Sequence, residues 1–271
     1  MLRARVEVRG LEMHYRQWGT AETPSLLLAH GLPDGGFVWS RLAEELQDVR
    51  RLIAFDLPGF GESEVPRGFA HTVSAYGNVF DGFVEALNLE RFDLAVHDIS
   101  GGYALPYAAL RRGQLGSLLI LNTQVFTGWH HHALARRYRR PVLGRLMTLR
   151  PPRGRFEKLL RPAFSAEPPE WYLDELWQVW SRRRTRRAVM KFYRQNEPEA
   201  WAAAERSLEK LRGVPTTVVW GDADPFIRGD FAERTAEALD ADLFHVPDAG
   251  HFPMVERPQE VAAAARTLWA R

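Results

Sequence analysis

Two side chains that could attack a carbon atom, Asp98 and Ser100, lie two residues apart at the end of an apolar run that begins at Phe92. A strand that stops at a nucleophile, followed by small residues and a helix, is typical of a nucleophile elbow. A serine nucleophile would indicate ester hydrolysis, whereas an aspartate would form an alkyl ester with an epoxide or an alkyl halide. The reaction class therefore depends on which residue occupies the turn.

The strand length favours Asp98 as the nucleophile. A strand of about five residues that starts at Phe92 ends at Val96 and places the turn around Asp98. Ser100 and Gly101 then follow, and both are small enough for the helix to sit close to the strand. With Ser100 at the turn, the strand would bury the Asp98 carboxylate, which costs several kcal/mol when unpaired. Neither choice matches G-x-S-x-G, because Val96 lies two residues before Asp98.

A second strand end could supply donors to a developing oxyanion. His30-Gly31-Leu32-Pro33 follows the apolar run at residues 25–29. A turn that contains glycine can aim the Leu32 backbone N–H at the reacting centre, with the Ile99 N–H as its partner. We therefore expect Leu32 and Ile99 to form an oxyanion hole.

Two later strand ends carry an acid and a histidine. Asp222 and Asp224 follow the apolar run at 216–220, and we favour Asp224 as the acid that orients a histidine, with Asp222 as a turn or capping residue. His251 lies in a loop after the last predicted strand, and we expect it to be the catalytic base. The order nucleophile, acid, histidine supports this triad.

Composition excludes several kinds of site. The chain has 271 residues and no cysteine, so disulfides, thiolate metal sites and thiol nucleophiles are excluded. Residues 1–7 lack the apolar core of a secretion signal, and no apolar run is long enough to span a membrane, so we expect a cytoplasmic protein. The triplet His130–His132 could bind a metal, but we interpret it as an exposed helix start. We expect neither metal nor organic cofactor.

The net charge of +2 hides a basic segment. Residues 125–213 contain 20 Arg and Lys against 9 Asp and Glu. We interpret this excess as a solvated helical surface, because no aromatic–basic interleaving or nucleic-acid motif accompanies it. The expected partner is a small-molecule substrate, with neither nucleic acid nor membrane, and the sequence assigns no oligomeric state.

Short β-like and helix-like runs alternate along the chain, which predicts an α/β class with a mostly parallel sheet flanked by helices. We expect strands at residues 3–8, 13–18, 25–29, 52–55, 92–96, 117–121, 216–220 and 243–246, and helices at 39–46, 72–87, 102–111, 231–239 and 258–269. The pattern changes at residues 124–212, which lack convincing strands. We therefore predict a core domain of residues 1–123 and 213–271, with a helical cap, or lid, inserted at 124–212.

The chain resembles the α/β-hydrolase fold family over nearly its full length. The motifs are HGLPDG at 30–35, DLPGFGES at 56–63, VHDISGG at 96–102, WGDADPF at 220–226 and DAGHFP at 248–253. It looks like the aspartate-nucleophile branch that holds epoxide hydrolases and haloalkane dehalogenases. Carried over by position, the resemblance implies that Asp98 is the nucleophile, His251 the base, Asp224 its orienting acid, and Leu32 and Ile99 the backbone donors.

Two departures bear on the reaction. Ser100 replaces the usual glycine of the elbow, and Ile99 stands where dehalogenases usually have a tryptophan that holds the leaving halide. Tyr193 lies in a short segment similar to the cap region where epoxide hydrolases place a proton-donating tyrosine; a second such tyrosine could be Tyr138 or Tyr172. We therefore predict an epoxide hydrolase-like enzyme. The alternatives are a haloalkane dehalogenase-like hydrolase with the same triad, a serine esterase that uses Ser100, and a non-catalytic ligand receptor on the same fold.

Overall fold

A single eight-stranded sheet organises the chain, as seen in a computed structural model that describes residues 1–20 and 24–270. Its strands are β1 (Leu2–Val8), β2 (Leu11–Trp18), β3 (Ser25–Ala29), β4 (Leu52–Phe55), β5 (Phe92–Asp98), β6 (Leu115–Thr123), β7 (Thr216–Gly221) and β8 (Asp242–Val246). The strand order is β1-β2-β4-β3-β5-β6-β7-β8. Only β1–β2 and β2–β4 pair antiparallel, so the predicted mostly parallel sheet is confirmed.

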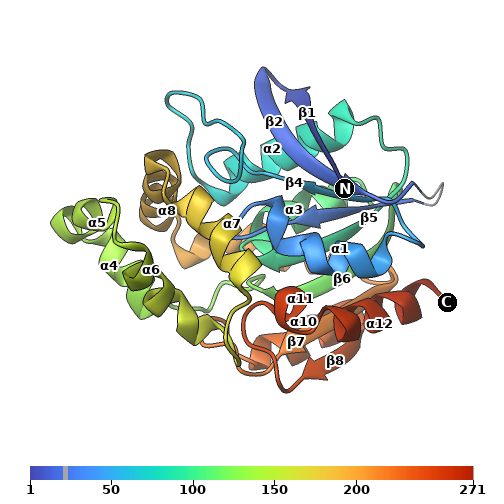
Figure 1. Ribbon diagram of the computed structural model, residues 1–271. Helices are drawn as coiled ribbons and strands as arrows, with labels where there is room; N and C mark the ends of the chain where they lie inside the picture. Colours follow the sequence, from blue (N-terminus) through green and yellow to red (C-terminus); the bar gives the residue numbers. More distant parts are fainter. Residues whose placement is uncertain (21–23, 271) are drawn as a thin grey trace.

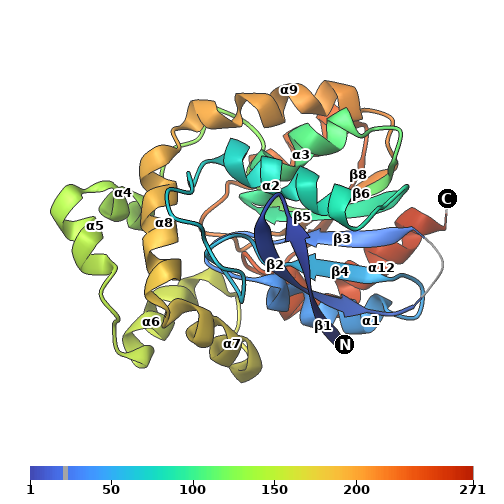
Figure 2. The same cartoon turned by 90° about the horizontal axis from the view of Figure 1, so that it is seen from above.

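Helices cover both faces of the sheet, which explains why the central strands are continuous apolar runs. One layer contains α2 (Val73–Ala86), α3 (Ser100–Leu110), α9 (Ala202–Leu211) and α10 (Asp230–Leu239), and the other contains η1 (Gly36–Trp39), α1 (Ser40–Leu46), α11 (Pro253–Glu256) and α12 (Pro258–Trp269). Figure 2 shows α2, α3 and α9 on one side of the strands and α1 and α12 on the other. Because β3 to β8 run parallel, their carboxyl ends lie along one edge of the sheet that these two helical layers leave uncovered.

Five further helices lie beyond that edge. They are α4 (Ala133–Arg139), α5 (Pro141–Met147), α6 (Arg153–Leu160), α7 (Glu170–Trp180) and α8 (Arg183–Gln195), with short 3-10 turns η2 (Arg161–Ala163) and η3 (Pro198–Trp201). Both ribbon views place α4, α5 and α6 at the end of the molecule opposite the chain termini (Figure 1). The described residues include no helix that is both apolar and long enough to cross a bilayer.

The position of α9 bears on the predicted division at residue 212. Although α9 lies within the range predicted for the cap, it packs against α3 in the helical layer over the sheet. Its buried side includes Ala204, Leu208 and Leu211, which is an apolar stripe at helical spacing. The division into core and cap stays a prediction, and the helices that cover the strand ends are α4 to α8.

Polar contacts to the backbone hold the cap on the core. Asn196 accepts a hydrogen bond from the Val73 N–H at 2.9 Å and donates to the His71 carbonyl at 2.8 Å. Thr185 donates to the Gly59 carbonyl at 3.0 Å. Because these groups are buried, each bond also satisfies a backbone atom that water does not reach. The cap therefore has a fixed position over the loops that follow β4.

The elbow differs from the predicted boundaries by two residues. β5 continues to Asp98 instead of ending at Val96, and α3 begins at Ser100 instead of Gly102. Pairing with β6 extends to Asp98 opposite Thr123, after a shift in register at His97. The strand therefore delivers Asp98 directly into the turn, and a single residue, Ile99, separates the strand from the helix.

We predict that Asp56→Ala destabilises the fold by about 2–4 kcal/mol. The buried Asp56 carboxylate accepts hydrogen bonds from the Gly36 N–H at 2.6 Å and from the Glu62 N–H at 2.8 Å, and the substitution leaves both donors unpaired. Urea unfolding measures the effect. Asp48→Ala is the matched control, because Asp48 is exposed and forms a surface ion pair with Arg266. Equal losses in the two variants would contradict the prediction.

Candidate active site

Asp98 occupies the tight turn at the carboxyl end of β5. Its φ of 56° lies in the left-handed region, which a residue with a side chain adopts only when the surrounding structure enforces it. This backbone geometry turns the carboxylate out of the sheet and into a cavity beneath the cap. The elbow thus presents Asp98 to the cavity.

Ser100 does not face the cavity. Its hydroxyl donates to the His97 carbonyl at 2.8 Å and accepts from the His97 N–H at 2.5 Å, and the residue is fully buried at the start of α3. Both hydrogen-bonding capacities of the hydroxyl are therefore used to brace the turn. This geometry gives no support to the serine esterase alternative.

Two backbone N–H groups act on the Asp98 carboxylate. The Leu32 N–H donates to Asp98 Oδ2 at 2.7 Å, and the Ile99 N–H also acts on this carboxylate. A Cβ atom on Gly31 would lie 2.3 Å from the Asp98 Cβ, so the loop can approach this closely only with glycine at that position. The two residues predicted as oxyanion donors thus lie beside the predicted nucleophile.

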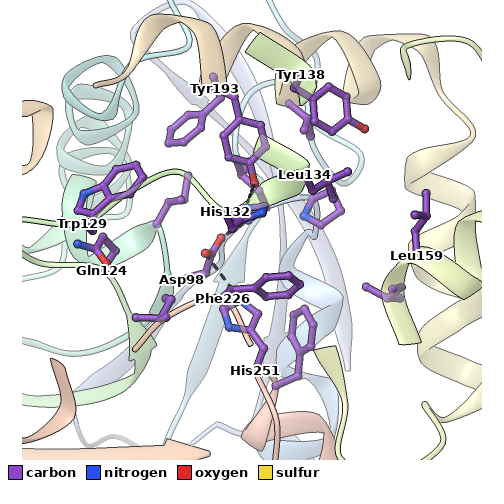
Figure 3. A pocket seen from close by; sticks show the side chains of 18 of the residues that line it. Asp98, Gln124, Trp129, His132, Leu134, Tyr138, Leu159, Tyr193, Phe226 and His251 are labelled. Atoms are coloured by element: carbon purple, nitrogen blue, oxygen red, sulfur yellow. Dashed lines mark hydrogen bonds and ion pairs between the residues drawn. The ribbon is translucent and has the colours of Figure 1, made fainter. Parts of the chain in front are cut away.

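His251 lies between two carboxylates. Its Nδ1–H donates to Asp224 Oδ2 at 2.8 Å, while its Nε2 is 3.7 Å from Asp98 Oδ1. Both His251 and the Asp224 side chain are buried. The three residues predicted as a triad therefore come together from three separate strand ends (Figure 3 shows Asp98 and His251).

Asn122 fixes Asp224 and was missed by the sequence analysis. Its side-chain amide donates to Asp224 Oδ2 at 2.9 Å and accepts from the Gly221 N–H at 2.8 Å. The other acid of the loop, Asp222, pairs with His245 on the surface, at 2.6 Å. A polar residue at the end of the buried strand β6 was the signal that could have identified Asn122.

Electrostatics favour a charged His251 in the free protein. Burial lowers the pKa of His251, but the carboxylates of Asp224 and Asp98 outweigh this effect and raise it to about 9. Burial raises the pKa of Asp98, while His251 and the two backbone N–H groups act in the opposite direction. The imidazolium therefore stabilises the Asp98 carboxylate in a site that water hardly enters.

His97 contacts His251 on the side of the sheet. Its Nε2–H donates to the His251 carbonyl at 2.7 Å, and the two rings lie 4.6 Å apart. Burial lowers the pKa of His97, so the ring stays neutral and adds no charge next to the imidazolium. His97 therefore positions the loop of His251.

The cavity above these residues has a volume of about 180 Å³ and is mostly aromatic and aliphatic. Its wall includes Leu32, Asp98, Ile99, Trp129, His132, Leu134, Tyr138, Phe156, Leu160, Trp180, Phe192, Tyr193, Trp201, Phe226 and His251. Such a wall fits a small apolar molecule with few polar atoms. Most of these side chains come from the cap, which closes the cavity over Asp98.

Tyr193 and His132 face Asp98 from the cap. The His132 Nε2 lies 3.2 Å from the Tyr193 hydroxyl, and Figure 3 shows both groups directed towards Asp98. His132 does start a helix, as the N-cap of α4, but the interpretation of this triplet as exposed was wrong for His132, because it is half-buried and lines the cavity. Its ring also packs against Phe226, which in turn contacts His251. In the sequence, only the position of His132 just before a helix pointed to its place as the N-cap of α4.

The other cap tyrosines lie differently. Tyr138 stacks on Tyr193 with ring centroids 5.8 Å apart, but its hydroxyl points away from Asp98 (Figure 3). Tyr172 is buried and donates to Asp34 at 2.8 Å, outside the cavity wall. Burial raises the pKa of Asp34 to about 7. Neither residue joins Tyr193 as a second donor.

A backbone hydrogen bond joins the histidine loop to the cap. The His251 N–H donates to the Ala163 carbonyl of η2 at 2.8 Å. The neighbouring Gly250 allows this approach, because a Cβ there would lie 2.3 Å from the same carbonyl oxygen. The cap therefore contributes to the alignment of His251.

Known proteins with the same fold include dehalogenases and epoxide hydrolases. "Haloalkane dehalogenase 2" of Mycobacterium tuberculosis is 28% identical over 93% of this chain and 89% of its own. "Epoxide hydrolase 3" of Xenopus tropicalis is 24% identical over 95% of this chain and 74% of its own. Among solved structures, haloalkane dehalogenase DbeA from Bradyrhizobium elkani has a TM-score of 0.87 at 20% identity, covering 99% of this chain and 98% of that one.

The epoxide hydrolase CorEH is similar to the same degree, with a TM-score of 0.85 at 21% identity over 99% of this chain and 98% of its own. These structural matches agree with the mostly parallel sheet and its flanking helices. The model of the alpha/beta hydrolase family matches residues 26–264, which is most of the sequence. The chain therefore belongs to the alpha/beta hydrolase family.

Proposed function

We propose that this protein hydrolyses a small apolar epoxide through an ester on Asp98. The observation that carries this proposal is the Tyr193 hydroxyl in the cap, directed at the Asp98 carboxylate across an apolar cavity. An epoxide needs a nucleophile at carbon and a proton donor at oxygen, on opposite sides of the same small group. Asp98 and Tyr193 supply these two functions from opposite walls.

In the first step, Asp98 Oδ1 attacks an epoxide carbon, and the ring C–O bond breaks as Tyr193 donates its proton to the oxygen. Asp98 Oδ2 stays on the Leu32 N–H, with the Ile99 N–H beside the same carboxyl group, and becomes the ester carbonyl oxygen. The donors therefore already bind the atom that carries negative charge in the second step.

His132 orients the proton of Tyr193. Burial, followed by the charge of His251, lowers the pKa of His132 to about 4, so its ring is neutral at neutral pH. Its Nδ1 accepts the Ala135 N–H at the start of α4, which leaves the proton on Nε2. That Nε2–H then donates to the Tyr193 oxygen at 3.2 Å, and the tyrosine's own proton is left for the substrate.

In the second step, water attacks the Asp98 ester carbon and gives a proton to His251. Alkylation removes the Asp98 charge that helped to raise the pKa of His251, so this pKa falls. The imidazolium then gives up its proton, the Tyr193 phenolate left by the first step takes one up, and the neutral imidazole can act as a base. Asp224 keeps its hydrogen bond to Nδ1 and stabilises the imidazolium that forms again. The tetrahedral intermediate then collapses: the bond from the Asp98 carboxyl carbon to the product oxygen breaks, that oxygen takes the remaining proton of the attacking water, and the diol leaves the Asp98 carboxylate.

The cavity wall also gives some support to a second candidate, a haloalkane dehalogenase-like reaction. Trp129, Trp180 and Trp201 line the cavity, and in the described part of the chain their indole N–H groups have no hydrogen-bond partner. Such donors would stabilise a departing halide. The Ile99 side chain has no hydrogen-bond donor and does not serve this purpose. The same nucleophile and base would serve both reactions.

A single turnover in heavy-oxygen water should place the label in the Asp98 peptide. Water attacks the enzyme's own ester carbon, so the diol keeps an oxygen that came from Asp98, and the label stays on the carboxylate. Peptide mass spectrometry after proteolysis measures this. Label found only in the product would show that water attacks the substrate directly and would reject Asp98 as nucleophile.

Tyr193→Phe should lower kcat/KM for an epoxide by about 10²-fold or more, because the departing oxygen loses its proton donor. Tyr138→Phe is the matched control, since its hydroxyl points away from Asp98, and it should remain close to the unmodified protein. Activity is measured by diol formation, and bromide release from a short bromoalkane is measured in parallel. Bromide release without epoxide turnover, unaffected by Tyr193→Phe, would favour the dehalogenase candidate instead.

The pH profile of kcat/KM should distinguish an aspartate nucleophile. Asp98 attacks as the carboxylate, and burial raises its pKa. As the pH is lowered, activity should therefore be lost at a higher pH than the ordinary pKa of aspartate. No rise is expected between neutral pH and the His251 pKa of about 9, because the first step needs no neutral imidazole. A profile that increases through that range would indicate that His251 must be deprotonated for the attack.

A further inference from the structure

Three large apolar side chains are exposed on one face of α5 and the residues after it. Val142, Leu146 and Leu149 are 72%, 56% and 65% exposed, and their spacing of four and three residues places them on the same side. Exposed apolar groups gathered in this way indicate a surface that contacts another apolar phase or molecule. The described part of the chain provides no element that covers them.

The same segment carries strong positive charge. Residues 133–160, which contain α4, α5 and α6, hold nine Arg and Lys and a single acid, Glu157. Two of the arginines are neutralised in ion pairs, Arg139 with Glu197 and Arg153 with Glu157 and Asp174. The other seven are exposed and form no ion pair among the described residues: Arg136, Arg137, Arg140, Arg145, Arg150, Arg155 and Lys158.

We propose that this basic apolar surface, residues 133–160, docks on an anionic phospholipid membrane. Apolar side chains that enter the acyl boundary, with arginines at the level of the phosphates, are the arrangement by which proteins bind such surfaces. A second copy of the chain fits less well, because a symmetric contact would place these cations against each other. The proposal replaces the expectation of a solvated basic surface without a membrane partner, and it is independent of the reaction assigned to Asp98.

The docking surface is connected to the cavity. Leu159 on α6 is 48% exposed and also lines the cavity, so it lies at the rim. Leu134, Tyr138 and Phe156, from α4 and α6, form the inner side of the same segment. A molecule dissolved in the lipid would therefore meet an apolar edge that leads into the apolar cavity.

Sedimentation of the full chain with vesicles tests this proposal. Vesicles of phosphatidylcholine with phosphatidylglycerol should bind the protein, and vesicles of phosphatidylcholine alone should bind it weakly. Arg145→Glu with Arg155→Glu, and separately Leu146→Ser with Leu149→Ser, should each reduce binding to anionic vesicles by about tenfold or more. Matched single controls, Arg91→Glu and Leu110→Ser, change exposed residues of the same types outside the segment and should leave binding unchanged.

Several outcomes would overturn the proposal. Equal binding to neutral and anionic vesicles would contradict it, and so would equal losses of binding in the control variants. If the leucine changes have no effect, only a general attraction between charges is left. Binding to heparin or duplex DNA as strong as to vesicles would assign the surface to polyanions. Dimerisation in sedimentation velocity that the leucine changes abolish, without vesicle binding, would assign it to a second copy. Thermal unfolding of every variant confirms that the fold is retained.

Discussion

The charge balance around His251 is the interaction on which the site depends. Two carboxylates, Asp224 and Asp98, face one imidazole in an interior that water hardly enters. Two anions so close together would not both stay ionised without a cation between them. The imidazolium supplies that cation. The Asn122 amide and the Leu32 N–H stabilise the two carboxylates further through hydrogen bonds.

The two parts of the chain contribute to the site in different ways. The sheet supplies groups whose positions are fixed by backbone geometry, above all Asp98 in its left-handed turn. The cap supplies most of the apolar wall of the cavity, including Tyr193. Relatives of this chain are named for two different reactions.

The sequence identified strand-end residues well and cap residues poorly. Asp98, Asp224 and His251 were predictable because parallel strands end at one edge, so that position along the chain determines position in space. His132 was predicted to be exposed, because the neighbouring residues do not show which side of a short helix faces the cavity. The turn was predicted at Asp98, but the bounds of the strand and helix beside it differ by two residues, since pairing with β6 continues past a register shift to Asp98 itself. The packing of α9 against α3 was also not predictable, because the composition of a helix does not show which neighbour its apolar side contacts.

The hydrogen bond from His251 to Ala163 makes the base dependent on the cap as well as on the sheet. Were η2 to lift, this N–H would lose its acceptor in an apolar setting, and the imidazole would lose one of its supports. Grafting a foreign cap onto this core would therefore succeed only if the graft brings a carbonyl to the same point. Evolution of new specificity in this chain is consequently freer in α4 and α5 than in the turn that follows α6.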